Sequence, residues 1–279
     1  MQVQWYPGHM TKAKRMMQED IKLIDLVMEL VDARIPLSSR NPDIDELAKG
    51  KSRLILLNKS DLSDPKSNEK WIKYFKEKGF TTLLIDSRTR GGFGVIMKSI
   101  EEVCSAKIER DRKRGILNRP VRAMVVGIPN VGKSTFINSL CKKACTKTGN
   151  KPGVTKGKQW VKLNKNVELL DTPGILWPKF DNEEIGMNLA YIGSINDEIL
   201  DETELVCNLI KYLKGNYPGV LFNRFGVNEE DEVATLLENI GRKRGCLKKQ
   251  DEVDIDKVSR IFLEEFRSGK LGKITLEEP

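Results

Sequence analysis

The segment Gly127-Ile-Pro-Asn-Val-Gly132-Lys133-Ser134 matches the G-x-x-x-x-G-K-[ST] pattern of a phosphate-binding loop in full. An apolar run at residues 123–126, typical of a buried strand, precedes it, and residues 135–144 follow with apolar side chains at helical spacing. The two glycines let the backbone wrap closely around an anion, and the N–H groups at the start of the helix then point at phosphate oxygens. A chance glycine-rich turn is the alternative, and the matching flanks on both sides argue against it.

Within this loop the side chains have separate expected roles. Lys133 is expected to bridge the β- and γ-phosphates and so to act in catalysis, and Ser134 to offer its hydroxyl to Mg²⁺. The loop residues expected to contact the nucleotide are Asn130, Val131, Gly132, Lys133, Ser134 and Thr135.

A second motif, Asn58-Lys59-Ser60-Asp61, follows the apolar residues 53–57 and fits the N-K-x-D pattern that reads guanine. The Asp61 carboxylate can accept hydrogen bonds from N1–H and from the exocyclic amine of guanine. Adenine offers neither donor there, so it would leave a carboxylate unpaired. Asn58 and Lys59 are expected to support the ring and to tie this loop to the phosphate loop. The motif therefore predicts GTP or GDP as the ligand.

Asp171-Thr-Pro-Gly174 supplies a third part of the expected site. Asp171 would hold Mg²⁺ through water, and the Gly174 N–H would meet the γ-phosphate. Thr155, in a glycine-rich basic segment, is the candidate that completes the Mg²⁺ shell when GTP is bound, with a catalytic role.

A further base-contacting loop is expected at Asp86 and Ser87, after a strand that ends at Ile85. The residue that follows the serine in such loops is usually alanine. Here it is Arg88, so the motif is degenerate.

The guanine-reading motif precedes the phosphate loop, which reverses the usual order in GTPases. Because such motifs sit at the carboxyl ends of strands, a circular permutation can leave the site intact. The predicted fold class is α/β: a circularly permuted P-loop GTPase domain, with a mostly parallel sheet and helices on both faces, followed by an all-helical C-terminal domain. The first domain is placed at residues 1–178, with a basic N-terminal arm at about residues 1–20, and the second at residues 179–279.

The 48 Lys and Arg against 40 Asp and Glu give a net charge of +8, which favours a polyanionic partner such as nucleic acid. A basic surface without such a partner is equally compatible with charge alone. Five cysteines without a C-x-x-C pair, and a single histidine, argue against a zinc site and indicate reduced thiols. No apolar run is long enough to span a membrane, and no signal peptide is recognisable, so the expected location is the cytoplasm.

With these motifs in this order, the chain resembles the YlqF/RbgA family of circularly permuted ribosome-assembly GTPases. The resemblance is carried by the three motifs above together with Trp5-Tyr-Pro-Gly-His9-Met, Asp32-Ala-Arg-Ile-Pro36, Pro152-Gly-Val-Thr155 and Arg267-Ser-Gly-Lys-Leu-Gly272. It implies a cytoplasmic GTPase that acts late in large-subunit assembly, binds the large ribosomal subunit and its rRNA in the GTP state, and is released on hydrolysis that the particle stimulates. A monomer with no membrane contact and no DNA specificity is expected. The helical domain is expected to be basic and to contact rRNA, with basic clusters at residues 242–244, 248–249 and 267–273.

Many GTPases place a glutamine directly after D-x-x-G to orient the attacking water, and this chain has Ile175. We therefore expect slow intrinsic hydrolysis. His9 is the candidate that orients water, since a neutral imidazole can accept a proton near pH 7. The alternative is that His9 stacks on RNA or packs under the aromatic arm. The Asn130 side chain is a candidate ligand for K⁺ between phosphates.

Two other functions remain open from the sequence. The protein could be a GTP-dependent regulator of a protein target that acts through its helical domain. It could also be an RNA-binding assembly factor for which hydrolysis is incidental.

Overall fold

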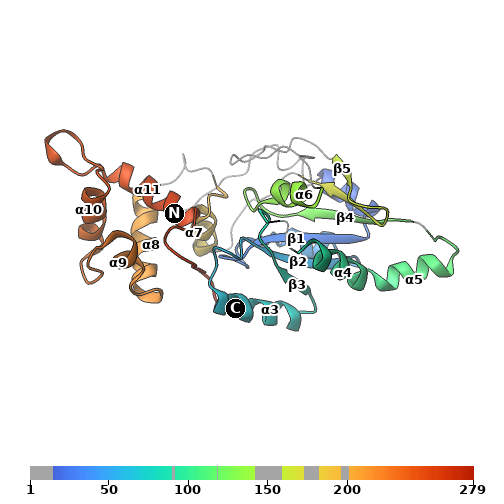
Figure 1. Cartoon of the computed structure of the whole chain (residues 1–279). Coiled ribbons are helices and arrows are strands. Elements are labelled where there is room, and N and C mark those ends of the chain that lie inside the picture. The colour runs from blue at the N-terminus through green and yellow to red at the C-terminus, as the bar shows by residue number, and fades with distance from the viewer. Residues whose placement is uncertain (1–14, 90–91, 118, 142–158, 173–181, 196–200) are drawn as a thin grey trace. The chain divides into compact units, whose positions relative to one another are not determined.

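The computed structural model describes residues 15–89, 92–117, 119–141, 159–172, 182–195 and 201–279 (Figure 1). It divides into two compact units, Met1–Gly186 with Thr275–Pro279, and Met187–Ile274. The predicted boundary between residues 178 and 179 lies outside the described residues, as does most of the predicted N-terminal arm. The end of that arm, residues 15–20, is helical.

A six-stranded sheet in the order β3-β2-β1-β4-β6-β5 forms the centre of the first unit. All neighbouring strands run parallel except β5, which pairs antiparallel with β6. Every residue of the central strand β1 is buried, as expected for a parallel sheet covered on both faces. The strands are β1 Leu26–Asp32, β2 Ser52–Asn58, β3 Thr81–Leu84, β4 Val121–Val126, β5 Gln159–Lys162 and β6 Val167–Asp171.

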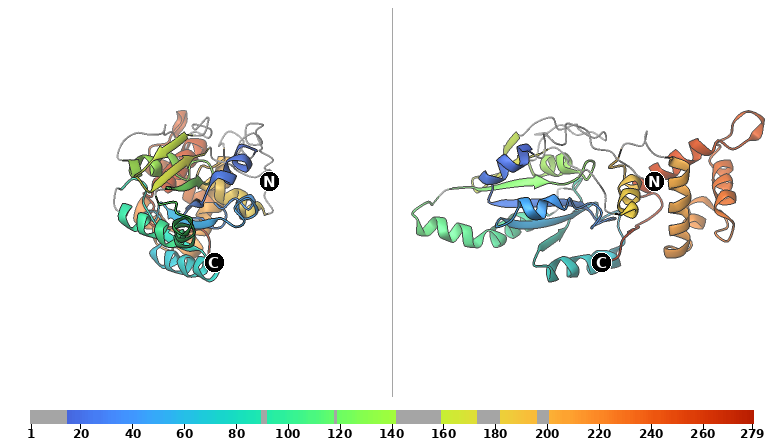
Figure 2. Two further views of the ribbon diagram at one scale, coloured as in Figure 1. Left: turned by 90° about the vertical axis from the view of Figure 1, so that its right-hand side faces the viewer. Right: turned by 180° about the vertical axis from the view of Figure 1, so that it is seen from behind.

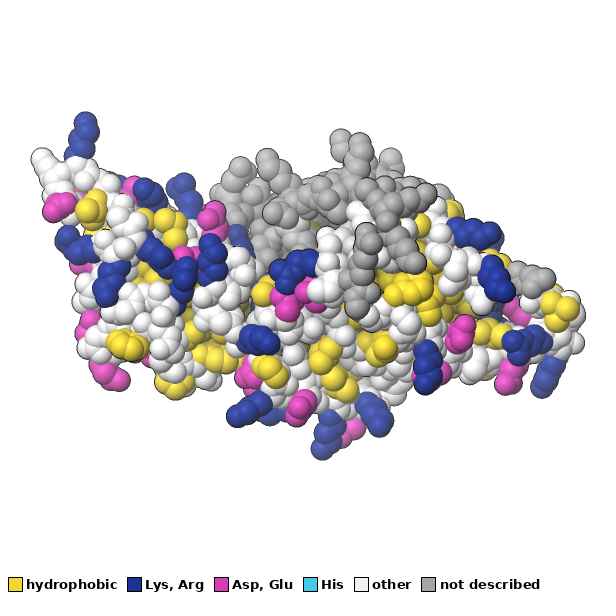
Figure 3. All heavy atoms as spheres, in the orientation of Figure 1, with side chains coloured by type: hydrophobic (Ala, Val, Ile, Leu, Met, Phe, Trp, Pro, Cys, Tyr) yellow, Lys and Arg dark blue, Asp and Glu magenta, His cyan; other side chains and the backbone are white. Residues whose placement is uncertain are grey.

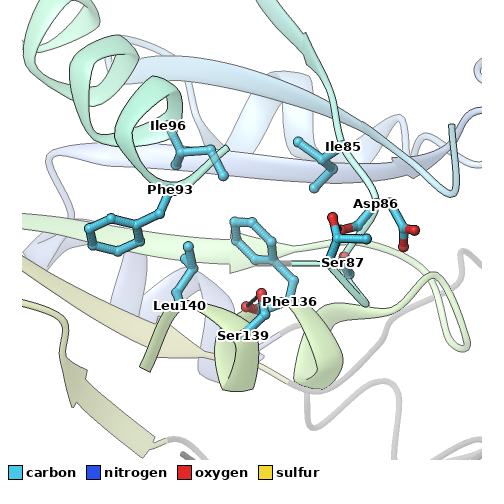
Figure 4. A pocket seen from close by; sticks show the side chains of 9 residues that line it. Ile85, Asp86, Ser87, Phe93, Ile96, Phe136, Ser139 and Leu140 are labelled. Atoms are coloured by element: carbon cyan, nitrogen blue, oxygen red, sulfur yellow. Dashed lines mark hydrogen bonds between the residues drawn. The ribbon is translucent and has the colours of Figure 1, made fainter. Parts of the chain in front are cut away.

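Helices cover both faces of this sheet, as predicted. On one face, Trp71 and Phe75 of α3 (Pro65–Glu77) pack on Val31, Ile55 and Leu57 of β1 and β2. The short helix α2 (Asp43–Leu47) packs beside it, through Ile44. On the other face lie α4 (Phe93–Val103) and α6 (Lys133–Cys141), and Figure 4 shows these two helices in front of the strands. Helix α5 (Ser105–Lys113) follows α4 in the chain.

The chemistry-bearing motifs follow the carboxyl ends of β2, β3, β4 and β6. Because these strands are parallel, their ends meet at one edge of the sheet, and this is how the permuted order still assembles one site. The predicted circularly permuted α/β fold is confirmed. The strands expected at residues 53–57 and 123–126, and the strand end expected at Ile85, differ from the observed bounds by at most two residues. Helix α6 begins two residues earlier than predicted, at Lys133.

The second unit is helical over its described residues, apart from a single bridge between Leu247 and Val253. Leu205, Leu209, Phe262 and Phe266 are among its buried residues. Its helices, shown from two further sides in Figure 2, are α7 Glu183–Tyr191 (which begins in the first unit), α8 Glu202–Asn216, α9 Val220–Phe225, α10 Val233–Lys243 and α11 Ile255–Arg267.

Glu229 precedes α10 and does not belong to that helix, which begins at Val233. The reason is that the Glu229 carboxylate accepts the backbone N–H groups of Gly219, Leu221 and Phe222, and so caps α9. A carboxylate used in this way stabilises the start of the preceding helix rather than beginning a new one.

The charge of the C-terminal region differs from the prediction. Residues 179–279 contain 14 Lys and Arg against 21 Asp and Glu, whereas residues 1–178 contain 34 against 19. The region is therefore acidic as a whole, and its positive charge is local. Figure 3 shows Lys and Arg side chains on the visible face of the helical unit with Asp and Glu among them.

Two of the predicted basic clusters are partly used inside the helical unit. Arg267 donates to the carbonyl oxygens of Tyr191 and Ala190, at 3.0 and 2.7 Å, which terminate α7. Arg244 pairs with Glu265 at 2.9 Å. Among the described helices, none combines the length and apolarity needed to cross a bilayer.

Candidate nucleotide-binding site

Asn58, the last residue of β2, joins three loops of the predicted site. Its Nδ2 donates to the carbonyl oxygen of Val131 at 2.7 Å. Its Oδ1 accepts from the backbone N–H of Ser87 at 3.0 Å and from the Ser87 hydroxyl at 2.7 Å. The guanine-reading loop, the phosphate loop and the second predicted base-contacting loop are thereby fixed to one buried amide.

The close approach of Asn58 requires a glycine in the phosphate loop. Gly132 has φ of +102°, and a Cβ added to it would lie 2.5 Å from Asn58 Nδ2. Gly127 is equally constrained, because its added Cβ would lie 2.5 Å from the Leu30 carbonyl oxygen. Gly127 and Gly132 are thus needed because a side chain would clash with neighbouring groups, and their lack of a Cβ also lets the backbone approach an anion closely.

Lys59 connects the same loops by a second route. Its Nζ donates to the carbonyl oxygen of Asn130 at 3.0 Å and pairs with Asp32 Oδ2 at 2.9 Å. Arg34 binds Asp32 through two hydrogen bonds of 2.9 Å, and both of these side chains are buried. Burial alone would raise the pKa of Asp32, but Arg34 and Lys59 outweigh it and hold the pKa well below its usual range.

Asp32 and Arg34 were not predicted as site residues. The sequence does contain an indication of an ion pair here, because Asp32 and Arg34 directly follow an apolar run and charged side chains are rarely buried unless they are paired. Their partner could not be read from the pattern, since Lys59 lies on the next strand's loop.

Lys133 and Asp171 lie on the phosphate loop and at the end of β6. Lys133 Nζ donates to the carbonyl oxygens of Gly127 and Ile128, at 3.0 and 2.8 Å. Burial lowers the pKa of Lys133 to about 8, with Asp171 opposing the shift. Burial raises the pKa of Asp171 to about 6, with Lys133 opposing. Each group therefore affects the pKa of the other, in a part of the site that burial shields from water.

The residues present fit a magnesium ion. Both carboxylate oxygens of Asp171 are buried, and neither has a hydrogen-bond partner within the described residues. A buried carboxylate without a donor is costly unless a cation accompanies it. Asp171 and the Ser134 hydroxyl supply hard oxygen ligands, which Mg²⁺ prefers, and Mg²⁺ usually takes its remaining ligands from water and phosphate.

The loop after β3 contains Asp86, Ser87 and Arg88. Ser60 is fixed to it, because its hydroxyl and its backbone N–H both donate to the Ile85 carbonyl oxygen, at 3.0 and 3.2 Å. Arg88 forms ion pairs with Asp61 and Asp86. The predicted guanine reader thus already contacts an arginine side chain.

A small hollow lies behind this loop, between the end of β3, the start of α4 and α6 (Figure 4). Apolar side chains form most of its lining, and hydroxyls and one carboxylate the rest. The lining residues are Ile85, Asp86, Ser87, Thr89, Phe93, Ile96, Phe136, Ser139 and Leu140. Asp86 and Ser87 therefore line the same hollow as Phe136, Ser139 and Leu140 of α6.

Three predicted site residues, His9, Thr155 and Gly174, lie outside the described residues. The structure brings together Asn58, Lys59, Ser87, Asn130, Val131 and Gly132 through the contacts above, and it places Lys133, Ser134 and Thr135 in the first turn of α6.

Comparisons with known proteins agree with this arrangement. Residues 122–247 match the model of a family described as 50S ribosome-binding GTPase. The chain is 47% identical to ribosome biogenesis GTPase A of Bacillus cereus, over 100% of this chain and 95% of the relative. It is 33% identical to the protein of the same name from Thermotoga maritima, over 99% and 94% of the two chains.

Solved structures agree as well. A GNP-bound crystal structure of YlqF from T. maritima is 29% identical, with a TM-score of 0.67 over 96% of this chain and 98% of that one. A GDP-bound YlqF structure is 28% identical, with a TM-score of 0.69 over 95% and 99%.

Proposed function

The chain belongs to the ribosome biogenesis GTPase A family, and from this premise we propose that it binds the large ribosomal subunit and its rRNA in the GTP state and leaves when GTP is hydrolysed. That it is a GTPase that binds guanine nucleotides follows from the family. The observation that carries the proposed site is Asn58, whose amide holds the guanine-reading loop and the phosphate loop together.

In the proposed site, Asp61 reads the N1–H and exocyclic amine of guanine, and Asn58 and Lys59 position it. Ser60, Asp86 and Ser87 form the wall beside the base. The backbone from Asn130 to Thr135 binds phosphate oxygens, helped by the start of α6. When the nucleotide binds, the Lys133 ammonium gives up its hydrogen bonds to the loop carbonyl oxygens and donates to β- and γ-phosphate oxygens instead. This exchange is favourable because the phosphate oxygens carry full negative charge.

Ser134, Asp171 and Thr155 would hold Mg²⁺. When bound, the ion neutralises charge that develops on the phosphate oxygens during transfer. The orphaned Asp171 oxygens support this assignment. Gly174 would meet the γ-phosphate.

Water is oriented from outside the D-T-P-G motif, since Ile175 follows it. We assign this to His9, and a K⁺ ion bound by Asn130 would supply further positive charge between phosphates. Slow turnover without a partner follows, because His9 lies in an N-terminal segment that the particle could position.

Contact with rRNA is supported by the excess of 34 Lys and Arg over 19 Asp and Glu in residues 1–178. On α5 and just after it, Arg110, Arg112, Lys113 and Arg114 are exposed, whereas Lys107 is buried against Asp25 and Asp111. In the predicted basic clusters of the helical unit, the exposed cations that remain for RNA include Arg242, Lys249, Lys270 and Lys273, whereas Lys248 pairs with Asp254 at 3.9 Å. The protein acts as a monomer in the cytoplasm in this proposal.

The experiment is GTP turnover in K⁺ buffer with and without purified large ribosomal subunits, using Lys133→Ala as the inactive control. Strong stimulation by subunits, absent in the control, supports the proposal. Binding of both proteins to subunits without stimulation would favour an RNA-binding factor with incidental hydrolysis. Failure to bind subunits, with GDP binding intact, would favour a regulator of a protein target.

A further inference from the structure

The guanidinium of Arg88 contacts two carboxylates of the proposed base site. Its Nη2 donates to Asp61 Oδ2 and, at 3.2 Å, to Asp86 Oδ2. Its Nε donates to Asp86 Oδ1 at 3.1 Å. An arginine at this position is the feature by which this loop departs from the usual base-contacting motif.

Asp86 fixes the direction in which Arg88 points. Asp86 Oδ1 also accepts the backbone N–H of Arg88 at 2.9 Å, so the carboxylate binds both ends of the same residue. The Arg88 side chain is 64% exposed, while that of Asp61 is 29% exposed. Arg88 therefore covers Asp61 from the solvent side and has room to move away.

Guanine recognition by Asp61 needs both carboxylate oxygens, one for each donor of the base. Oδ1 is buried and has no hydrogen-bond partner within the described residues. Oδ2 is engaged by Arg88. We propose that Arg88 is an internal competitor of guanine for Asp61, a residue that lowers affinity for GDP and GTP and speeds their release. This inference rests on the proposed role of Asp61 as the guanine reader.

The direction of the effect holds even if Arg88 stays in place. Carboxylate Oδ2 has a second lone pair and could accept from guanine as well. The guanidinium would then lie beside the partly positive N–H edge of the base, which also weakens binding. Both arrangements predict that removing the guanidinium tightens binding.

The size of the effect is limited by exposure. Ion pairs between exposed side chains are worth about 1 kcal/mol or less, which corresponds to at most about a fivefold change in affinity. Salt screens such pairs, so the effect should shrink as ionic strength rises. A competitor of this kind favours spontaneous exchange of GDP for GTP.

The test measures the affinity and release rate of fluorescently labelled GDP for wild-type protein and for Arg88→Ala. The matched control is Arg260→Ala, because Arg260 in the helical unit is 67% exposed and pairs with Glu202. We expect Arg88→Ala to bind GDP about two- to fivefold tighter with slower release at low salt, a smaller difference at 0.5 M salt, and no change in the control. Unchanged or weaker binding in Arg88→Ala, or an equal gain in Arg260→Ala, would overturn the proposal.

A second pair of variants separates this inference from the function on which it rests. Asp61→Asn should shift preference from GDP towards xanthosine diphosphate, and failure of that shift refutes the role of Asp61. In the Asp61→Asn background, Arg88→Ala should leave residual GDP affinity unchanged, since the carboxylate for which the two compete is gone. A gain that persists there would show that Arg88 acts by another route.

Discussion

The backbone N–H of Leu276 donates to the carbonyl oxygen of Arg34 at 2.8 Å, which joins the end of the chain to the loop after β1. Around this bond, Glu277 caps the backbone N–H groups of Leu37 and Ser38, and the Thr275 hydroxyl accepts from the N–H of Asp64. The chain thus leaves the first unit through α7 and returns to it at residues 275–279. The C-terminal tail is a structural part of the GTPase unit, although the sequence placed it in the helical domain.

Truncation after Thr275 should destabilise the protein. It removes the buried Leu276 and the acceptor of the Trp71 indole N–H, which is the Glu277 carbonyl oxygen. Burial of a leucine contributes about 1.5–3 kcal/mol, and each hydrogen bond about 1 kcal/mol. For the leucine and the Trp71 hydrogen bond together this is about 2.5–4 kcal/mol, so we expect a melting temperature lower by roughly 5–16 °C, since 1 kcal/mol shifts it by roughly 2–4 °C. Removal of Pro279 alone is the control, and an equal melting temperature for both truncations would contradict the role of the tail.

Asp32→Asn should cost far more stability than a change at an exposed carboxylate. It leaves the buried guanidinium of Arg34 and the ammonium of Lys59 without their counter-charge. Breaking one side of a buried ion pair costs about 3–5 kcal/mol. Asp45→Asn is the control, because Asp45 pairs with Arg40 and Arg53 but is 54% exposed, and its loss should cost about 1 kcal/mol or less. Urea unfolding measures both, and similar costs would show that the buried cluster adds nothing.

Gly132→Ala should abolish tight GDP binding while the protein stays folded. An alanine there would place its Cβ 2.5 Å from Asn58 Nδ2 at a backbone φ of +102°, so the Asn58 contact to the phosphate loop must open. Gly94→Ala is the control, since Gly94 lies within α4 with nothing within 4 Å of its added Cβ. Calorimetric titration with GDP should show loss of affinity by more than tenfold in the first variant only. Near-normal affinity in Gly132→Ala would mean that the loop accommodates a side chain.

His9→Ala should remove most of the stimulation of turnover by large subunits without weakening GDP binding, because its imidazole is assigned to water rather than to the nucleotide. General acid–base groups contribute about 10²–10⁴-fold. Stimulated turnover that His9→Ala leaves intact would refute this assignment.

Asn130→Ala should remove the preference for K⁺ over Na⁺ and leave the turnover rate in Na⁺ buffer similar, because the Asn130 side chain is the proposed K⁺ ligand. A wild-type turnover rate that is the same in K⁺ and in Na⁺ would refute the K⁺ site.

The sequence predicted the parts of the site that short contiguous patterns encode. Gly132 and Asn58 could be assigned because their motifs follow apolar strands, and parallel strands bring their ends together. The pairing of Arg88 with Asp61 and that of Leu276 with Arg34 could not be predicted, since they depend on side-chain direction and on contacts between distant segments. The acidic balance of residues 179–279 follows from the amino-acid composition alone, although the Lys and Arg residues are locally clustered.

Asp171 should destabilise the nucleotide-free protein progressively as pH rises from about 4 to 6. Burial raises the pKa of Asp171 from 3.8 to about 6, so the folded state binds more protons than the unfolded state between these values. The contribution of Asp171 to stability therefore falls with rising pH across this window, by about 3 kcal/mol at most, and is constant above it. Asp171→Asn lacks the ionisable group, so it should show less of this fall and exceed the wild type at pH 7. Urea unfolding in EDTA from pH 4 to 7 measures the difference, and parallel curves for the two proteins would show that Asp171 is ionised at no cost in the folded state.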